Sequence, residues 1–189
     1  MTKSINIDLG CGKSKKEEYI GLECGKLAGV DIICNLNEGL HLKDNSVDRV
    51  HSSHNLEHLN DPLFMLEEIH RVLKKGGIVE IIVPHWSWYG SHTFMHKAYF
   101  HSKDFDFFEK DNPFNYYTKA SFKILSKRIR YGKGRHKWWA KPICRLIDQI
   151  LNRNQLFSEQ FLVNIFMPES IRIVMKKDEY GVKPHNQEV

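Results

Sequence analysis

Residues 4–12 read SINIDLGCG, and this stretch decides which fold the rest of the chain can adopt. Ser4–Leu9 has the pattern of a short strand, and it runs directly into a turn made of Gly10, Cys11 and Gly12. Glycine allows a sharp turn and leaves no Cβ in the way of a ligand that lies against the backbone. At the carboxyl end of the first strand of an α/β sheet, such a turn commonly holds a cofactor. A plain strand-to-loop turn could use the same residues.

The segments that follow alternate apolar strands with turns and one strong helix. Strands are predicted at residues 19–23, 30–34, 47–52 and 78–83. A helix is predicted to start at Pro62 with Asp61 as its cap, and to end at Lys74-Lys75 before Gly76-Gly77. Alternation of this kind favours an α/β fold with a buried, largely parallel sheet. The link 13–19 is too short for a full crossover helix, so a turn or a stub of helix is predicted there.

Beyond Pro84 the sequence changes character. Residues 85–118 are crowded with aromatic and histidine side chains without a clear period, which indicates a lid or insertion with one short helix near 102–109. A strand is predicted at 121–131, an amphipathic helix at 142–152 and a closing strand at 171–175. We therefore expect one domain over 1–189, made of a cofactor-binding half (1–84), an insertion (85–120), C-terminal strands and helix (121–176) and a tail (177–189).

Composition sets broad limits on function. The 189 residues are 41% hydrophobic and 27% charged, which is ordinary for a globular protein, and the net charge of +5 permits an anionic partner without requiring one. The N-terminus has no signal-peptide pattern and no apolar run reaches membrane-spanning length, so we expect a cytoplasmic protein. The four cysteines form no C-x-x-C pair and are interpreted as reduced thiols.

An acidic residue, Glu23, ends the second predicted strand. A carboxylate can accept two hydrogen bonds from a vicinal diol, so a residue there suits the ribose of a nucleoside cofactor. A solvated strand end is the simpler interpretation of Glu23 taken alone. The turn lacks the third glycine of the dinucleotide fingerprint, which counts against a nicotinamide enzyme.

Three later phrases make the pattern more specific. They are Leu40–Asp48 (LHLKDNSVD), Ser53–His58 (SHNLEH) and Arg71–Gly77 (RVLKKGG). Together with the DLGCG turn and Glu23, they resemble the class I S-adenosylmethionine-dependent methyltransferases, and in particular the small members with a shortened first helix. The resemblance covers residues 4–84 and implies a Rossmann-like, mostly parallel sheet with an antiparallel closing strand. It implies S-adenosylmethionine as cofactor and says little about the substrate.

The resemblance also implies roles for individual residues. The turn formed by Asp8, Leu9, Gly10, Cys11 and Gly12 would hold the methionine part of the cofactor. Glu23 would bind the ribose hydroxyls. Asn35 and Leu36 would flank the adenine, although the family commonly has Asp at the position of Asn35. Ser53 and His54, just past the fourth strand, would lie beside the cofactor and its methyl group.

The stretch His54-x-x-Glu57-His58 also spells an inverted zinc-protease motif. That interpretation needs both histidines on a long helix and a third ligand further along. Here His54 directly follows a predicted strand, within a phrase that the methyltransferases also carry. We therefore interpret His54 as a residue of the cofactor pocket and His58 as a local packing residue, and we expect no metal.

Methyl transfer needs alignment of acceptor and methyl, and a base only where the acceptor must lose a proton. His54, His85 and His96 are the candidate catalytic residues, with His85 and His96 facing the substrate. A metal held by His92 and His96, with His85 or His101, is the alternative for this region. The aromatic residues after strand five favour an apolar or ring-bearing small-molecule acceptor, which could be lipid-linked or carry a sugar.

The basic residues near 127–139, followed by Trp138-Trp139, leave further functions open. They could bind nucleic acid or contact a membrane surface, or they could form a solvated face. Two alternatives to a small-molecule methyltransferase therefore remain: a nucleic-acid methyltransferase and a non-catalytic, cofactor-binding partner subunit.

Overall fold

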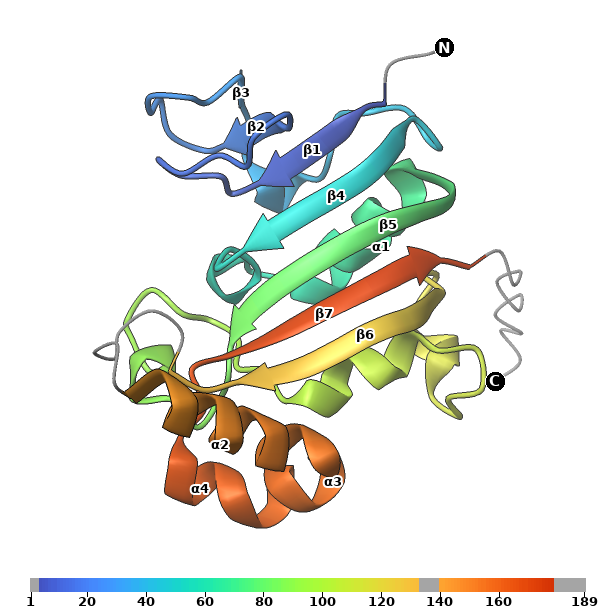
Figure 1. The fold of residues 1–189 in the computed structure, drawn as a ribbon. Coiled ribbons are helices and arrows are strands. Elements are labelled where there is room, and N and C mark those ends of the chain that lie inside the picture. The colour runs from blue at the N-terminus through green and yellow to red at the C-terminus, as the bar shows by residue number, and fades with distance from the viewer. Residues whose placement is uncertain (1–3, 133–139, 179–189) are drawn as a thin grey trace.

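The computed structural model describes residues 4–132 and 140–178. Its centre is a seven-stranded sheet in the order β3-β2-β1-β4-β5-β7-β6, in which β7 runs antiparallel to both neighbours (Figure 1). The strands are β1 (Asn6–Leu9), β2 (Ile20–Glu23), β3 (Ile32–Ile33), β4 (Val47–Ser53), β5 (Leu73–Pro84), β6 (Phe122–Arg130) and β7 (Ser170–Lys177). The strand order reverses between β1 and β4, so the ends of these strands form a topological switch point. The predicted Rossmann-like sheet with an antiparallel closing strand is confirmed.

Helix α1 (Pro62–Val72) packs behind the sheet and begins as predicted. Asp61 Oδ1 accepts a hydrogen bond from the backbone N–H of Phe64 at 2.9 Å and so caps the helix. The predicted end was wrong: the helix stops at Val72, and β5 begins at Leu73. Leu73 pairs with Val47 of β4, and the register then shifts before Ile78 pairs with Arg49. Pairing with the neighbouring strand therefore takes over where the local pattern still favours helix.

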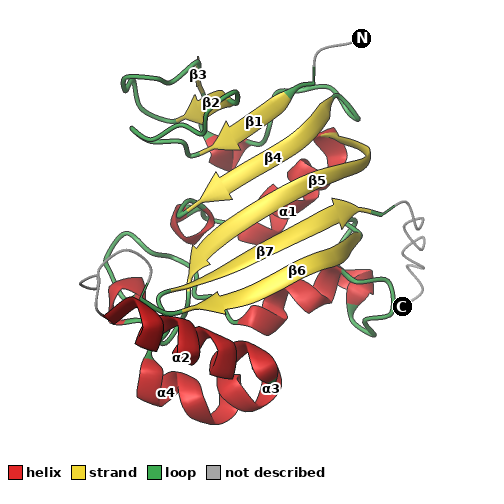
Figure 2. Ribbon diagram, in the orientation of Figure 1, coloured by secondary structure: helices red, strands yellow, loops and turns green. Residues whose placement is uncertain are grey.

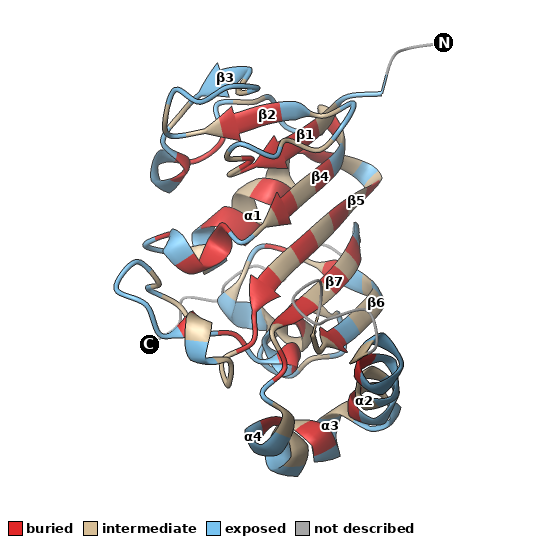
Figure 3. Ribbon diagram, turned by 60° about the vertical axis from the view of Figure 1, so that its left-hand side comes forward, coloured by how far each residue is buried: buried red, intermediate tan, exposed pale blue. Residues whose placement is uncertain are grey.

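One face of the predicted buried sheet is only half-buried in the structure. Buried and half-buried residues alternate along β5, as Figure 3 shows. No helix of the described residues crosses the front face in Figure 1, and Figure 2 shows loops where the first two crossovers run. On this face Glu80 binds Lys16 and Arg172, each at 2.6 Å. The predicted absence of a helix in the link 13–19 is confirmed, and Lys16 comes from that link.

The aromatic segment after β5 is partly buried in the core and partly exposed. It contains short 3₁₀ helices, η3 (Tyr89–Ser91), η4 (Ser102–Phe108) and η5 (Asn115–Tyr117), and η4 is the short helix expected near 102–109. Phe100, Phe105 and Phe108 are buried within the same apolar cluster as the strands. Two further 3₁₀ helices, η1 (Leu36–Glu38) and η2 (Leu56–His58), lie in the first half of the chain.

A helical appendage lies between β6 and β7. It comprises α2 (Lys141–Arg153), α3 (Gln155–Phe157), a π-helical turn η7 (Ser158–Leu162) and α4 (Val163–Phe166). The apolar stripe predicted for the first of these helices exists, but Ile143, Leu146 and Ile150 are exposed. Only Cys144 and Leu151 of α2 are buried. Among the described residues, no helix is both long enough and apolar enough to span a membrane.

Candidate functional site

The glycine turn after β1 lies at the carboxyl edge of the parallel strands. The backbone N–H groups of Gly10 and Cys11 both donate to Leu22 O, at 2.9 and 3.3 Å, which ties the turn to β2. Gly10 and Gly12 have φ angles of +63° and +52°, in the left-handed region that favours glycine. A Cβ on Gly10 would lie 2.3 Å from Asn55 Oδ1, whereas a Cβ on Gly12 would meet nothing within 4 Å. Gly10 is therefore required for packing, and Gly12 borders open space that a ligand can fill.

Glu23 stands at the same edge and contacts the glycine turn directly. Its Oε2 accepts from the Gly12 N–H at 2.9 Å, and its Oε1 accepts from the Cys24 N–H at 2.8 Å. Burial alone would raise the pKa of this carboxyl, but hydrogen bonds from the Cys24 thiol and from backbone N–H groups, that of Gly12 included, hold it below its ordinary value. Glu23 is therefore a carboxylate at the edge of the turn, and a diol would replace the contact that the exposed Cys24 thiol makes with Oε1 at 3.2 Å.

Asp8 is already engaged by groups of the protein itself. It is buried, its Oδ2 accepts from the Lys16 N–H at 2.7 Å, and its Oδ1 pairs with His51 Nδ1 at 2.7 Å. Both carboxylate oxygens thus hold protein groups. We interpret Asp8 as a residue that fixes the loop 11–19 against the open face of the sheet.

The two residues expected beside the adenine differ in exposure. Leu36 is buried in the core, and it does not present a free apolar surface. Asn35 is exposed and caps η1, with its Oδ1 accepting from the Asn37 N–H at 3.1 Å and its Nδ2 donating to Glu38 at 2.8 Å. Only Asn35 is available to a cofactor from this pair.

Ser53 and His54 lie at the carboxyl end of β4, next to the glycine turn. His54 has φ +52°, an uncommon conformation for a residue with a side chain, and its ring is 50% exposed. Its backbone N–H donates to Ile82 O at 2.8 Å, so β5 fixes this conformation. Backbone strain of this kind concentrates at functional sites.

Four side chains from two segments meet beside His54. His54 Nδ1 lies 3.4 Å from Glu57 Oε1, and the ring of His96 packs edge-on against that of His58 with 4.8 Å between centroids. Glu57 is fully buried. The sequence singled out His54 and His96, and the structure brings them to the same cluster.

His85 is not part of this cluster, and the prediction that it faces the substrate does not fit its position. It is 0% exposed, with Nε2 3.2 Å from Glu159 Oε2 of the appendage and Nδ1 2.8 Å from Ser87 Oγ. Burial would raise the pKa of Glu159, but hydrogen bonds, first that from His85, lower it to about 2. His85 therefore joins β5 to the appendage, and we leave it out of the proposed catalytic set.

The alternative metal set of His92, His96, His85 and His101 is not assembled either. His92 stacks on Tyr99, His101 lies over Trp86, and His85 is enclosed as described. The basic stretch is only partly visible, since residues 133–139 lie outside the described residues. Within its described part, Lys127 is paired with Asp106.

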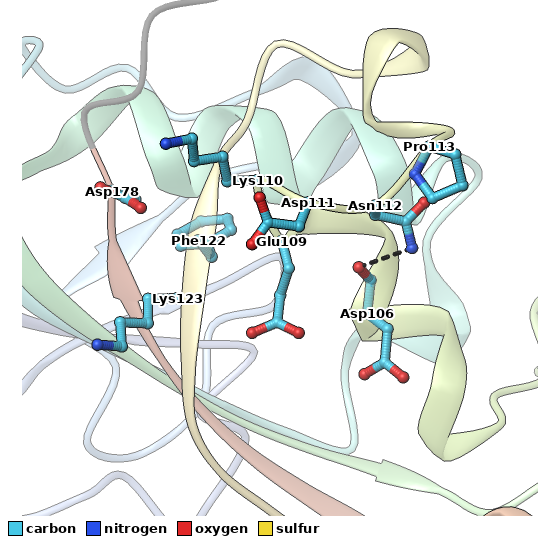
Figure 4. A pocket seen from close by; sticks show the side chains of 9 residues that line it. All are labelled: Asp106, Glu109, Lys110, Asp111, Asn112, Pro113, Phe122, Lys123 and Asp178. Atoms are coloured by element: carbon cyan, nitrogen blue, oxygen red, sulfur yellow. Dashed lines mark hydrogen bonds between the residues drawn. The ribbon is translucent and has the colours of Figure 1, made fainter.

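A pocket of about 500 Å³ lies at the opposite edge of the sheet from the glycine turn. It is lined by residues of the loop after η4 and by the start of β6, together with Asp178 just past β7 (Figure 4). Because β6 runs parallel to β5, these residues stand at the amino edge of the sheet, opposite the glycine turn. Cofactors of α/β sheets bind at the carboxyl edge, so this pocket is not the candidate cofactor site.

Residues 30–81 match a family model described as a methyltransferase domain. The sheet order is that of the class I methyltransferase fold, and the matched segment resembles a methyltransferase domain. The methyl donor of this class is S-adenosylmethionine, and the glycine turn with Glu23 fits such a donor by the contacts described above. No curated protein matches the chain in sequence.

Solved structures of methyltransferases share the fold of this chain. A S-adenosylmethionine-dependent methyltransferase from Thermotoga maritima is 15% identical with a TM-score of 0.57, covering 94% of this chain and 84% of that one. One from Archaeoglobus fulgidus is 18% identical with a TM-score of 0.54, covering 92% and 86%. A structure of the Haloferax volcanii Trm112 methyltransferase activator in complex with a methyltransferase is also similar. It is 16% identical with a TM-score of 0.56, covering 92% of this chain and 82% of that one.

Sequence reasoning missed several residues that organise the site. Asn55 limits the space at Gly10, Glu57 lies under the histidines, and Glu159 holds His85. Glu57 carried a signal, because it sits between His54 and His58 in the inverted zinc motif. Glu159 carried none, since 74 residues separate it from the histidine it contacts.

Proposed function

We propose that this methyltransferase moves the methyl group of S-adenosylmethionine to an oxygen or nitrogen atom of a small-molecule acceptor. The observation that carries the proposal is the 2.9 Å hydrogen bond between the Gly12 N–H and Glu23 Oε2, which joins the two cofactor motifs into one cradle. When bound, the donor supplies an electrophilic methyl group on a sulfonium.

Each group of the cradle has a separate task in this proposal. The backbone of Gly10–Gly12 lies against the methionine part, with the open space at Gly12 as the point of closest approach. Glu23 holds the ribose hydroxyls, which take the place of the exposed Cys24 thiol at Oε1. Asn35 takes the adenine side, and Ser53 and His54 border the methyl.

His54 is the proposed general base for an acceptor that carries a proton. Its ring is half exposed, and the carboxylate of Glu57 lies 3.4 Å from its Nδ1. A carboxylate beside one ring nitrogen orients the imidazole and favours its protonated form after it takes a proton. Most of the remaining rate comes from alignment of acceptor and methyl.

The helical appendage favours an acceptor with a lipid part. Large apolar side chains on α2 to α4 point to solvent, among them Leu146, Phe161 and Ile165. Basic residues flank them, with Lys141, Arg145 and Arg153 on α2. Apolar surface next to basic residues is typical of protein faces that rest on a membrane interface.

A nucleic-acid acceptor is supported less well by the described residues. On β6, Lys127 is neutralised by Asp106 and Arg130 is only partly exposed, which leaves Lys123 and Arg128 as the exposed cations of this strand. Binding to RNA with a steep salt dependence would instead favour that acceptor.

Calorimetric titration of S-adenosylhomocysteine tests the cofactor part of the proposal. We expect binding by the wild-type protein, and its loss in Gly12→Val, because valine fills the open space beside the turn. Glu23→Ala should weaken binding by at least about 10-fold, since charge-assisted hydrogen bonds contribute roughly 1.5–3 kcal/mol. Gly25→Ala is the control, because a Cβ there meets nothing and lies outside the turn. Absence of binding in folded wild-type protein would contradict the proposal.

A further inference from the structure

We propose that Glu57, His58 and His96 bind a divalent transition-metal ion of the zinc class. Each residue offers one ligand atom, and these three atoms lie within 4.8 Å of one another. Among the described residues, this is the one group of three or more His, Cys, Asp or Glu side chains that meets this spacing. Two imidazoles and one carboxylate form a common donor set for zinc and for non-haem iron.

The buried carboxylate of Glu57 is the first observation that points to a cation. The residue is 1% exposed, and neither Oε1 nor Oε2 has a hydrogen-bond partner. A buried, ionised carboxylate without hydrogen bonds costs several kcal/mol unless a positive charge lies next to it. The nearest cationic candidate is the ring of His54, at 3.4 Å, which is half exposed. A metal ion would supply the missing charge and occupy the free lone pairs.

The tautomers of the two histidines are the second observation. His58 Nδ1 lies 3.0 Å from Met95 O, and His96 Nδ1 lies 2.8 Å from Ser91 O. A carbonyl oxygen can only accept, so both Nδ1 atoms carry the hydrogen and both Nε2 atoms present a lone pair. Histidines that bind a metal usually donate their other N–H in this way, often to a backbone carbonyl.

The backbone holds the two ligand segments together. The N–H groups of Lys97 and Ala98 both donate to the carbonyl oxygen of Glu57, at 2.7 and 3.3 Å. This places His96 over η2, where its ring meets that of His58 at an interplanar angle of 75°. Zinc–nitrogen bonds are about 2.0–2.1 Å, so side-chain shifts on the order of 1 Å would close the three ligands on one ion.

The proposed site differs from the zinc-protease pattern, which would use His54 and His58 as ligands, because only His58 is a ligand in both. His54 and His58 do not share a helix, and the third ligand comes from the segment after β5. The site goes beyond the proposed function, because it uses none of the residues proposed for the cofactor and can be tested without the cofactor. It shares Glu57 with the proposed catalytic pair of His54 and Glu57.

Metal binding is measured on full-length protein freed of its purification tag and dialysed against a chelator. We expect one equivalent of Zn²⁺ to bind in competition with a chromophoric chelator, and Co²⁺ to give a visible absorption band. His58→Ala and His96→Ala should each lower the affinity by about 100-fold or more, since even outer-shell changes cost about 10–100-fold. His92→Ala and His101→Ala, from the same segment, are the matched controls and should bind as wild type.

The variant Glu57→Gln tests whether the negative charge of Glu57 is needed for metal binding. It keeps the shape of the side chain and removes its charge, so the metal-free variant should be folded and at least as thermally stable as wild type. We expect Zn²⁺ to raise the melting temperature of the wild-type protein and not that of Glu57→Gln. No stoichiometric Zn²⁺ binding by folded wild-type protein, or an equal loss in the His92 and His101 controls, would overturn the proposal.

Discussion

His85 Nε2 and Glu159 Oε2 lie 3.2 Å apart inside the protein, although 74 residues separate them in the chain. The same carboxylate accepts from the Ser102 N–H at 2.7 Å and from Trp86 Nε1 at 3.3 Å. One buried acid therefore connects the segment after β5 to the helical appendage. This gives the appendage a fixed position relative to the site.

The buried contact between His85 and Glu159 should contribute to stability. His85→Ala should lower the free energy of unfolding by about 3 kcal/mol, because it leaves a buried carboxylate without its main partner. Chemical denaturation monitored by circular dichroism measures the change. His101→Ala removes an exposed histidine of the same segment and should change stability by less than about 0.5 kcal/mol. Equal stability of His85→Ala and wild type would contradict the structural role given to His85.

A pair of glycines tests whether Gly10 is required by packing or only by its φ angle. Gly10 and Gly29 both have positive φ, but a Cβ on Gly29 meets nothing within 4 Å. Gly29→Ala should therefore cost about 1 kcal/mol, from backbone strain alone. Gly10→Ala adds a clash with the whole side chain of Asn55, and we expect at least twice that loss together with loss of S-adenosylhomocysteine binding. Similar effects of the two substitutions would show that Asn55 moves aside freely.

The open face of the sheet predicts an acid-sensitive stability. Burial would raise the pKa of Glu80, but hydrogen bonds from Lys16 and Arg172 lower it to about 2, well under its ordinary value of 4.5. A lowered pKa in the folded state means that the stabilisation is present above about pH 4.5 and is lost as the pH falls towards 2. Glu80→Gln should be less stable at pH 7 by about 1–3 kcal/mol, and the difference from wild type should vanish near pH 2. Denaturation curves at several pH values measure it; a difference that stays constant with pH would count against the ion pairs.

The role of His54 can be separated from cofactor binding once an acceptor has been found. His54→Ala should lower kcat by about 100-fold or more, as expected for loss of a general base, and leave the dissociation constant of S-adenosylhomocysteine within a few-fold of wild type. His41→Ala, an exposed histidine of another loop, serves for comparison. An unchanged kcat in His54→Ala would remove this residue from the mechanism.

The apolar surface of the appendage predicts binding to lipid. We expect the protein to sediment with vesicles that contain phosphatidylglycerol, and Leu146→Ser with Phe161→Ser to weaken this by about 10-fold. Leu125→Ser is the matched control, because Leu125 is a similarly exposed leucine on β6. All three side chains are exposed, so stability should not change. If the control weakens vesicle binding as much as the double variant, the appendage is not the contact surface.

The sequence by itself determined the sheet and the place of the cofactor turn. A strand that ends in Gly10-Cys11-Gly12, with an acid closing the next strand, predicts both motifs at one edge, because parallel strands bring their carboxyl ends together. The short link 13–19 also correctly excluded a first helix. These features depend on local pattern and on chain length, which a single sequence contains.

The tertiary structure alone decided which of the polar residues meet. Asp8 and Leu36 carry the family pattern, and the structure shows Asp8 bound to the backbone of Lys16 and Leu36 buried in the core. His85 and His96 look alike in the sequence, but Glu159 encloses the first and Glu57 lies beside the second. Such contacts join residues far apart in the chain, and their energy comes from satisfying buried charge, which no local pattern records.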